Sequence, residues 1–272
     1  MSADRTTTLS LLPVASLWWR EVIRFLRQRS RIIGALGSPV VFWLLIGAGF
    51  HKSYVAPGGA PGTTYAEFFY PGTLVLIVLF TAIFSTISII DDRKEGFLQS
   101  VLVAPVSRMT IVLGKVLGGA TLAFFQGCLF LCLAPLAGIS LGGPVGLLLT
   151  LYLLAVVSFA LTSVGFAIAW WMESTQGFHA IMNVILIPIW ILSGALFPVS
   201  GAHAGLKPVM LANPIFYCVE AFRWSFHSGG EGTPVDGQFL GLLGCLSAAT
   251  VFAAVAFAVA SVTASRSRKG WV

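Results

Sequence analysis

The longest interval without a charged side chain constrains this sequence more than any other feature. Between Lys115 and Glu173 the chain runs for 57 residues without one Asp, Glu, Lys or Arg. A helix needs about 20 apolar residues to cross the hydrocarbon core of a bilayer, so this interval is long enough for two crossings. Its glycine- and proline-rich stretch at 138–144 predicts the turn between them.

Further uncharged intervals lie at 32–51, 174–206 and 237–265. The 272 residues include only 16 basic and 10 acidic side chains, whereas about a quarter of a soluble domain is charged. This composition excludes an ordinary cytosolic enzyme, a disordered protein and a small disulfide-stapled secreted module. The sequence predicts six spans, at about 32–50, 72–90, 110–137, 145–172, 180–198 and 239–264.

These apolar runs are continuous rather than alternating, which favours helices over the strands of a membrane barrel. We expect an all-α membrane protein with six transmembrane helices, an N-terminal amphipathic interfacial helix and a broken outer helical segment before the last span. The expected organisation is a cytoplasmic tail with the interfacial helix at 1–31, a transmembrane domain at 32–265 and a basic cytoplasmic tail at 266–272.

Lys and Arg are distributed unevenly between the two sides of this predicted bundle. Thirteen lie before the first span, between the second and third spans, at the start of the third (Lys115) or after the last, and the other three are Lys52, Lys207 and Arg223. Cytoplasmic segments are enriched in Lys and Arg, so we expect a multi-pass protein of a bacterial plasma or inner membrane with both termini cytoplasmic. The net charge of +6 then needs no nucleic acid. A signal peptide is the alternative, but the charged region before the first apolar run is too long for one.

Residues 11–31 have the pattern of an amphipathic helix with an apolar face and an arginine face. Such a helix is typical of the headgroup region of a membrane. It either anchors the topology alone or also acts as a lever that contacts a cytoplasmic partner. The apolar face consists of Leu11, Ala15, Trp18, Val22, Phe25 and Leu26, and the arginine face of Arg20, Arg24, Arg27 and Arg31.

The cytoplasmic loop at 91–110 is about 20 residues long, whereas a simple connection can be four. It predicts a short helix that ends at Pro105. We expect its apolar face to pack on a partner, with Arg93 and Glu95 at the polar rim; packing on its own bundle is the alternative. The apolar face consists of Phe97, Leu98, Val101 and Leu102.

The outer segment at 199–237 is too apolar for a free loop, and Pro208 and Pro214 break it into short helices. We expect it at the outer interface or in a shallow dip into the outer leaflet, with Glu220 and Arg223 forming a weak surface ion pair. Its aromatic side chains predict an interfacial belt, formed by Phe216, Tyr217, Phe222, Trp224 and Phe226.

The chain contains no phosphate-binding loop, zinc-protease motif or serine-nucleophile motif. Its four Cys and four His lack metal-ligand spacing. We expect no catalytic, cofactor-binding or metal-binding residue, and no enzyme activity from this chain by itself. Gln126 and Asn183 are polar residues within spans and favour helix–helix hydrogen bonds over substrate binding, and Gly114-x-x-x-Gly118 is a pattern for close helix packing.

Four local patterns, in their order along the chain, resemble one family. Together with the six-span layout they resemble the membrane subunits of ABC-2 type transporters, over about residues 15–265. The patterns are Phe69-Tyr70-Pro71-Gly72 before the second span; Glu95-Gly96 with Leu98, Leu102 and Ala104-Pro105 in the cytoplasmic loop; Ser193-Gly194-Ala195-Leu196-Phe197-Pro198 at the end of the fifth span; and Asn213-Pro214 with Tyr217, Glu220 and Arg223 in the outer segment.

The resemblance implies an ATP-driven exporter that moves a hydrophobic or amphiphilic substrate, such as a drug, a lipid or a lipid-linked polysaccharide. It implies that this chain pairs with a second permease subunit, as a homodimer or heterodimer, above separate ATP-binding subunits that hold ATP-Mg. The loop at 91–110 is then the coupling helix, although Phe97 stands where many members have Thr or another small residue. The implied contacts with the ATP-binding subunit are Arg93, Glu95, Gly96, Phe97, Leu98, Val101, Leu102 and Pro105.

Two other functional classes remain open at this point. An ion-coupled secondary transporter usually carries titratable residues near the membrane midplane, and the predicted spans hold none there. A non-transporting membrane scaffold needs only packed helices, and the apolar cytoplasmic loop and the aromatic outer segment argue against it.

Overall fold

The computed structural model describes residues 11–50, 64–104, 106–135, 138–227 and 240–266, apart from the side chain of Arg31. All regular secondary structure in these ranges is helical. The elements are α1 (Leu11–Leu26), α2 (Arg29–Gly49), α3 (Tyr65–Lys94), α4 (Phe97–Val103), α5 (Arg108–Leu131), α6 (Gly143–Ala169), α7 (Thr175–Trp190), the π-helical turn η2 (Ile191–Ala195), α8 (Lys207–Ala212), α9 (Pro214–His227) and α10 (Leu242–Ser265).

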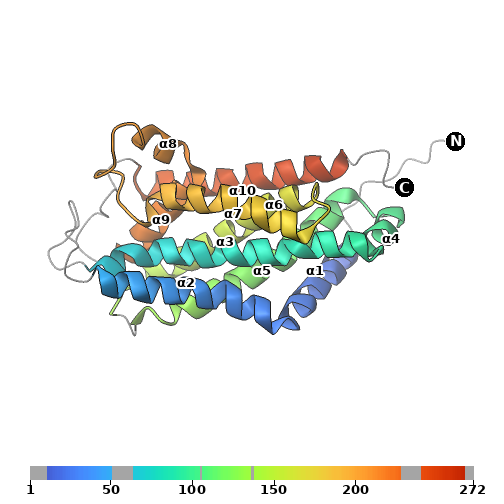
Figure 1. Cartoon of the computed structure of the whole chain (residues 1–272), viewed down its shortest axis with the longest axis horizontal. Coiled ribbons are helices and arrows are strands. Elements are labelled where there is room, and N and C mark those ends of the chain that lie inside the picture. Colours follow the sequence, from blue (N-terminus) through green and yellow to red (C-terminus); the bar gives the residue numbers. More distant parts are fainter. Residues whose placement is uncertain (1–10, 51–63, 105, 136–137, 228–239, 267–272) are drawn as a thin grey trace.

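Six helices in the described ranges are long and apolar enough to cross a membrane. They are α2, α3, α5, α6, α7 with η2, and α10, and they lie in the six stretches that the sequence predicts. The prediction of an all-α membrane protein is therefore confirmed. Figure 1 shows these helices as an elongated bundle, with α4 at one end and α8 and α9 at the other.

Helix α3 forms the centre of this bundle. In its most apolar 18-residue stretch 89% of the residues are buried, whereas the corresponding share is 22% in α2 and 22% in α10. The Tyr70 hydroxyl donates a hydrogen bond of 2.7 Å to the Phe130 carbonyl, and Trp43 packs edge-on against both rings. Helix α3 packs on α2, α5 and α6, while α2 and α10 present most of their surface outward.

Helix α10 packs on α6 through a stripe of small side chains. The residues recur every three or four positions, so they lie on one face of the helix, and they permit a close approach to α6. Valines on the opposite face, such as Val251 and Val255, are exposed, as expected of a surface toward lipid. The buried stripe is Cys245, Ala249, Ala253, Ala256, Ala260 and Ala264.

Helix α1 lies against the first half of α5, where two glycines leave room for it. A Cβ atom at Gly114 would lie 2.8 Å from the Cβ of Leu17, and one at Gly118 would lie 2.6 Å from the Cβ of Glu21. The Gly114-x-x-x-Gly118 pattern therefore marks a real close contact. It joins α5 to α1 rather than to another membrane-spanning helix.

The apolar face predicted for α1 is rotated from the observed one. The side chains buried in the structure are Val14, Leu17, Glu21 and Phe25, whereas Leu11 and Leu26 are exposed. Residues 11–26 are helical as expected, but packing against α5 decides which side chains point inward. The helix therefore has a second apolar side that no described residue covers.

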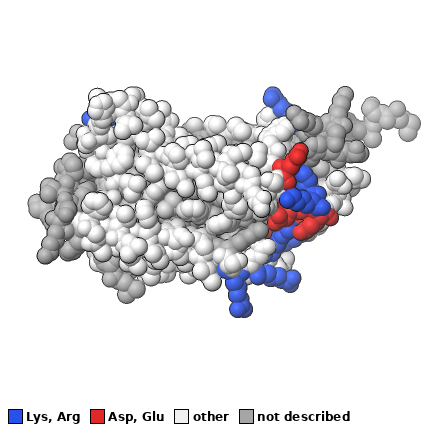
Figure 2. All heavy atoms as spheres, in the orientation of Figure 1, with Lys and Arg blue, Asp and Glu red and all other residues white. Residues whose placement is uncertain are grey.

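Charged side chains gather at the end of the molecule that carries α4. On the face shown in Figure 2 they cluster there, and the long middle of the bundle is almost free of them. The arrangement matches a bundle whose middle lies in hydrocarbon.

Candidate functional site

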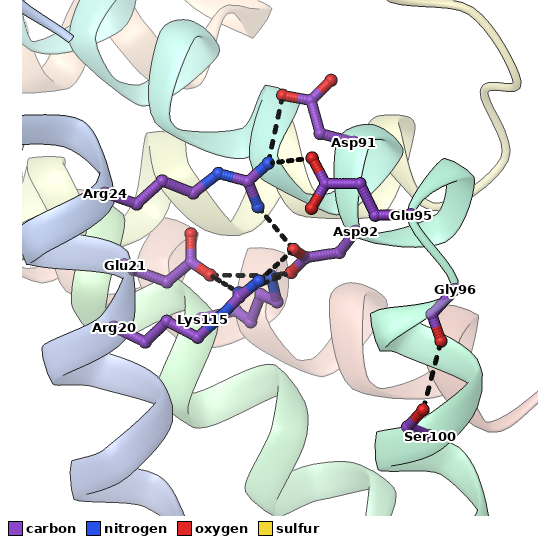
Figure 3. A network of polar contacts seen from close by, with 9 residues as sticks. All are labelled: Arg20, Glu21, Arg24, Asp91, Asp92, Glu95, Gly96, Ser100 and Lys115. Carbon is purple, nitrogen blue, oxygen red and sulfur yellow. Dashed lines mark hydrogen bonds and ion pairs between the residues drawn. The ribbon is translucent and has the colours of Figure 1, made fainter. Parts of the chain in front are cut away.

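The candidate functional site is a buried ion-pair network at this charged end. Asp92, in the last turn of α3, is fully buried. Its carboxylate accepts hydrogen bonds from Arg20 at 2.6 Å and Arg24 at 2.5 Å, both on α1. It also pairs with the ammonium of Lys115 on α5. One carboxylate thus joins three helices (Figure 3).

Lys115 is buried as well, with its Nζ atom 2.7 Å from the Glu21 carboxylate. The sequence places Lys115 near a span end, where a lysine normally reaches out to water. The structure shows the opposite arrangement, because Glu21 and Asp92 meet its ammonium inside the protein. Breaking such a buried pair by removing one partner leaves an uncompensated charge and costs about 3–5 kcal/mol.

The network continues outward to the start of α4. Arg24 lies 3.1 Å from the Glu95 carboxylate and 3.7 Å from that of Asp91. The Arg20 guanidinium lies 3.7 Å from the centroid of the Phe97 ring. Burial lowers the pKa of Arg20, but its hydrogen bond to Asp92 and the nearby carboxylates raise it above the ordinary arginine value overall. Arg20 therefore stays charged in this network.

Two more arginines donate hydrogen bonds to backbone carbonyls at the C-terminal ends of neighbouring helices. Arg93 donates hydrogen bonds to the carbonyls of Trp170 and Met172, just after α6, at 2.5 and 2.7 Å. Arg108 donates one of 3.2 Å to the Ala264 carbonyl in the last turn of α10. Arginine at these carbonyls satisfies acceptors that a helix leaves open at its C-terminus. Arg93 is thus turned toward α6, whereas the sequence analysis places it at the polar rim of a partner contact.

Helix α4 follows a sharp turn at Gly96, whose φ of 76° lies in the left-handed region that glycine adopts without strain. Leu98 is only 1% exposed, and Leu102 packs on the same core. For these two leucines the packing is on the chain's own bundle, the alternative considered above. Phe97 and Val101 are half-buried, and Pro105 lies outside the described residues.

The outward side of α4 carries different residues. Gln99 and Ser100 are exposed, and Val103 is 79% exposed. An isolated exposed valine is common, but here it ends a short helix that begins beside the network joining α1, α3 and α5. This side of α4 is the part of the element that remains available to another protein.

The remaining predicted residues of α1 have separate positions. The Trp18 indole donates a hydrogen bond of 2.9 Å to the Thr121 hydroxyl on α5, so Trp18 faces the protein. Arg20 and Arg24 turn toward α3, and Arg27 is exposed. The side chain of Arg31 lies outside the described part of the chain.

The outer segment holds the broken end of the fifth span. The amide of Asn213 donates to the Ile189 carbonyl at 2.6 Å, and the Tyr217 hydroxyl donates to the Leu211 carbonyl at 2.7 Å. Pro214 begins α9, where its missing N–H is not needed. These side chains thus satisfy backbone groups that the interrupted helices leave open.

The expectation of a surface pair between Glu220 and Arg223 is wrong, because both residues are buried. Arg223 also donates to the Gly194 carbonyl at 2.6 Å, and its guanidinium lies 4.2 Å from the centroid of the Phe68 ring. Gly194 has a φ of 77° inside η2. Arg223 therefore joins α9, the broken end of the fifth span and the start of α3.

The predicted aromatic belt is also partly wrong. Phe216, Phe222 and Phe226 are buried, with Phe222 and Phe226 in the main core. The reason is that α9 packs against α6 and α10 instead of lying along a membrane surface. Tyr217 and Trp224 are half-buried.

The two polar residues within spans differ. Gln126 shares a hydrogen bond of 2.5 Å with the Thr81 hydroxyl across α5 and α3, as expected of a helix–helix contact. Asn183 is exposed on α7, so the structure of the single chain does not give it that role.

Four members of the network could not be singled out from the sequence: Glu21, Asp91, Asp92 and Lys115. The available signal is that Lys115 and Glu21 each interrupt an apolar stripe at helical spacing. Within the described residues no group of three or more His, Cys, Asp or Glu is arranged to hold a metal ion. The site is one of packed helices and fixed charges.

Known proteins are similar to this chain over most of its length. The chain is 26% identical over 208 residues to the transport permease ycf38 of Cyanophora paradoxa, covering 76% of this chain and 71% of that protein. It is 25% identical to nodulation protein J of Rhizobium leguminosarum bv. viciae, covering 79% and 84%. It is 24% identical to the inner membrane transport permease YadH of Escherichia coli strain K12, covering 78% and 81%.

The family model of the ABC-2 type transporter matches residues 14–227. This range begins in α1 and ends with α9, so it contains both the ion-pair network and the outer segment. The chain therefore belongs to the ABC-2 type transporter family, as a transport permease subunit.

Proposed function

We propose that this permease is the membrane half of an ATP-driven exporter and that the ion-pair network transmits the movement of a separate ATP-binding subunit to the spans. The proposal rests on one observation. The Asp92 carboxylate forms ion pairs with Arg20, Arg24 and Lys115 just before the turn from α3 into α4. A displacement of α4 must move this carboxylate, and with it α1 and α5.

The energy source belongs to another subunit in this proposal. The sequence contains no phosphate-binding loop, so ATP-Mg must be held by the partner. The membership of the family in ATP-binding-cassette transport supports this assignment. Two permease subunits, identical or different, then form one pathway for a hydrophobic or amphiphilic substrate that leaves the cytoplasm or the inner leaflet.

The docking surface in this proposal is the outward side of α4. Gln99, Ser100 and Val103 face away from the bundle, whereas Leu98 does not. Glu95, which is exposed beside Arg24, lies at its edge. A partner that presses on this side transmits force to Asp92 through the Gly96 turn.

The experiment compares two exposed apolar residues at opposite ends of the molecule. Val103→Asp puts a charge at the proposed contact, and Leu206→Asp, before α8, is the matched control. Both variants should insert and fold, because both positions are exposed. The complex is then purified through a tag on the permease, and its retained ATP-binding subunit and ATP hydrolysis are measured.

We expect Val103→Asp to lose most of the retained subunit and of the ATP hydrolysis, because a carboxylate in an apolar contact is desolvated without a partner. Leu206→Asp should keep both. Equal retention by the two variants would show that this side of α4 is not the contact.

A further inference from the structure

A groove at the junction of α1 and α2 borders the ion-pair network, and the proposed function assigns it no ligand. It has a volume of 560 Å³ and is open to the outside. Its lining comes from the last turns of α1, the first position before α2 and the end of α3. The lining residues are Arg20, Ile23, Arg24, Arg27, Gln28 and Glu95.

The three arginines of the groove differ in how they are paired. Arg20 and Arg24 are held by Asp92 and Glu95. Arg27 is exposed, and the structure gives its guanidinium no hydrogen bond or ion pair with any described residue. Arg27 is therefore the cation of this groove that is available to an anion.

A second positive feature opens at the same place. Gln28 lines the groove and is also the N-cap of α2, and its side chain makes no capping hydrogen bond there. The first N–H groups of a helix carry a partial positive charge and bind anions, phosphate above all, when no side chain caps them. Arg27 lines the groove, and the uncapped start of α2 follows directly after Gln28, so both can donate to one anionic group beside Gln28.

The groove continues into an apolar surface. Ile23 lines it, and Trp19 and Leu26 lie on the same face of α1 at helical spacing, each 56% exposed. Leu12, seven residues before Trp19, is 81% exposed. A soluble phosphate ion would use only the donors, whereas a phospholipid uses both the donors and this stripe.

We propose that this groove binds the phosphate of an anionic phospholipid from the leaflet on the α4 side, with its acyl chains along Trp19 and Leu26. Arg27 binds the phosphate bidentately, a geometry that a planar guanidinium fits well. Glu95 and Asp91 border the network from α3, so the phosphate lies on the Arg27 side of the groove, away from these carboxylates. The bound lipid then fixes the angle between α1 and α2.

The test measures lipid binding to the purified full chain by native mass spectrometry. The probes are phosphatidylglycerol and phosphatidylcholine with the same acyl chains. The variants are Arg27→Gln, Arg27→Lys and, as a matched control, Arg266→Gln, which removes another exposed arginine after α10. The melting temperature of each variant checks that it folds.

We expect the chain to prefer phosphatidylglycerol, and Arg27→Gln to weaken its binding about fivefold while phosphatidylcholine binding stays unchanged. Arg27→Lys should retain most of the preference, and Arg266→Gln all of it. An unchanged preference in Arg27→Gln, or an equal loss in Arg266→Gln, overturns the site. Full displacement of the lipid by millimolar inorganic phosphate overturns the lipid as its occupant.

Discussion

At the scale of single residues, the ion-pair network depends on Asp92, whose carboxylate pairs with three cations. Its fully buried carboxylate compensates three cations, and without it Lys115 and Arg20 would have only Glu21 to share. Glu95 takes part in the same network but is 59% exposed at its side chain, and water can replace its contact with Arg24. The ion pairs of Asp92 therefore contribute more to the free energy of unfolding than the ion pair of Glu95.

Asp92→Asn should lower the free energy of unfolding by about 3 kcal/mol or more, because Lys115 and Arg20 keep their charge without their main partner. Glu95→Gln should change it by less than about 1 kcal/mol, since an exposed pair contributes little. The check is the thermal unfolding of both variants in detergent. Similar melting temperatures of the two variants would show that the buried ion pairs of Asp92 do not stabilise the fold.

A second residue-scale prediction concerns the pair of Arg223 and Glu220. Arg223→Met should destabilise the outer end, because it removes the hydrogen bond to Gly194 and leaves the buried carboxylate of Glu220 without this partner. The double variant Arg223→Met, Glu220→Gln should recover part of the lost stability, since no buried charge then remains from the pair. Proteolysis at the outer end measures both. A double variant less stable than the single one would contradict the prediction.

At the scale of elements, the sequence predicts the existence of helices better than their contacts. Charge-free runs define the spans because lipid allows few alternatives to a helix of about 20 residues. The face on which α1 packs could not be predicted from its own periodicity, because it is set by Gly114 and Gly118 on α5. Similarly, α9 is buried by α6 and α10, which its own aromatic residues do not reveal.

The α1–α5 contact gives an element-scale prediction. Gly118→Ala should push α1 away from α5 and destabilise the protein by about 1–3 kcal/mol, because the new Cβ would lie 2.6 Å from that of Glu21. Gly34→Ala in α2 is the matched control, because nothing lies within 4 Å of the added atom. Thermal unfolding compares the two, and an equal effect at both glycines would contradict a close α1–α5 contact.

At the scale of the whole molecule, the charged end with α4 and the outer end with α8 differ in what they can do. The charged end joins α1, α3 and α5 through side chains, and Arg93 and Arg108 add the ends of α6 and α10. The outer end joins η2, α9 and α3 through Arg223. Helix α3 runs between them, so a movement at one end has a direct route to the other.

We predict the orientation of the whole bundle from the distribution of basic residues. In a cysteine-free background, Arg266→Cys should be protected from an impermeant thiol reagent in intact cells, and Gly205→Cys should react. Both positions are exposed, so reactivity reports the side of the membrane. Labelling of Arg266→Cys from outside would reverse the proposed topology.

Crosslinking in the cell shows whether α4 lies against an ATP-binding subunit, as the proposed function requires. A photoreactive amino acid is placed at Val103 and, in a second strain, at Leu206. We expect the Val103 probe to form an adduct with a protein that carries a phosphate-binding loop, and the Leu206 probe to form none. The proposed contact would be contradicted if an ATP-binding subunit crosslinked to the Leu206 probe. It would also be contradicted if a subunit that co-purifies with the permease never crosslinked to the Val103 probe.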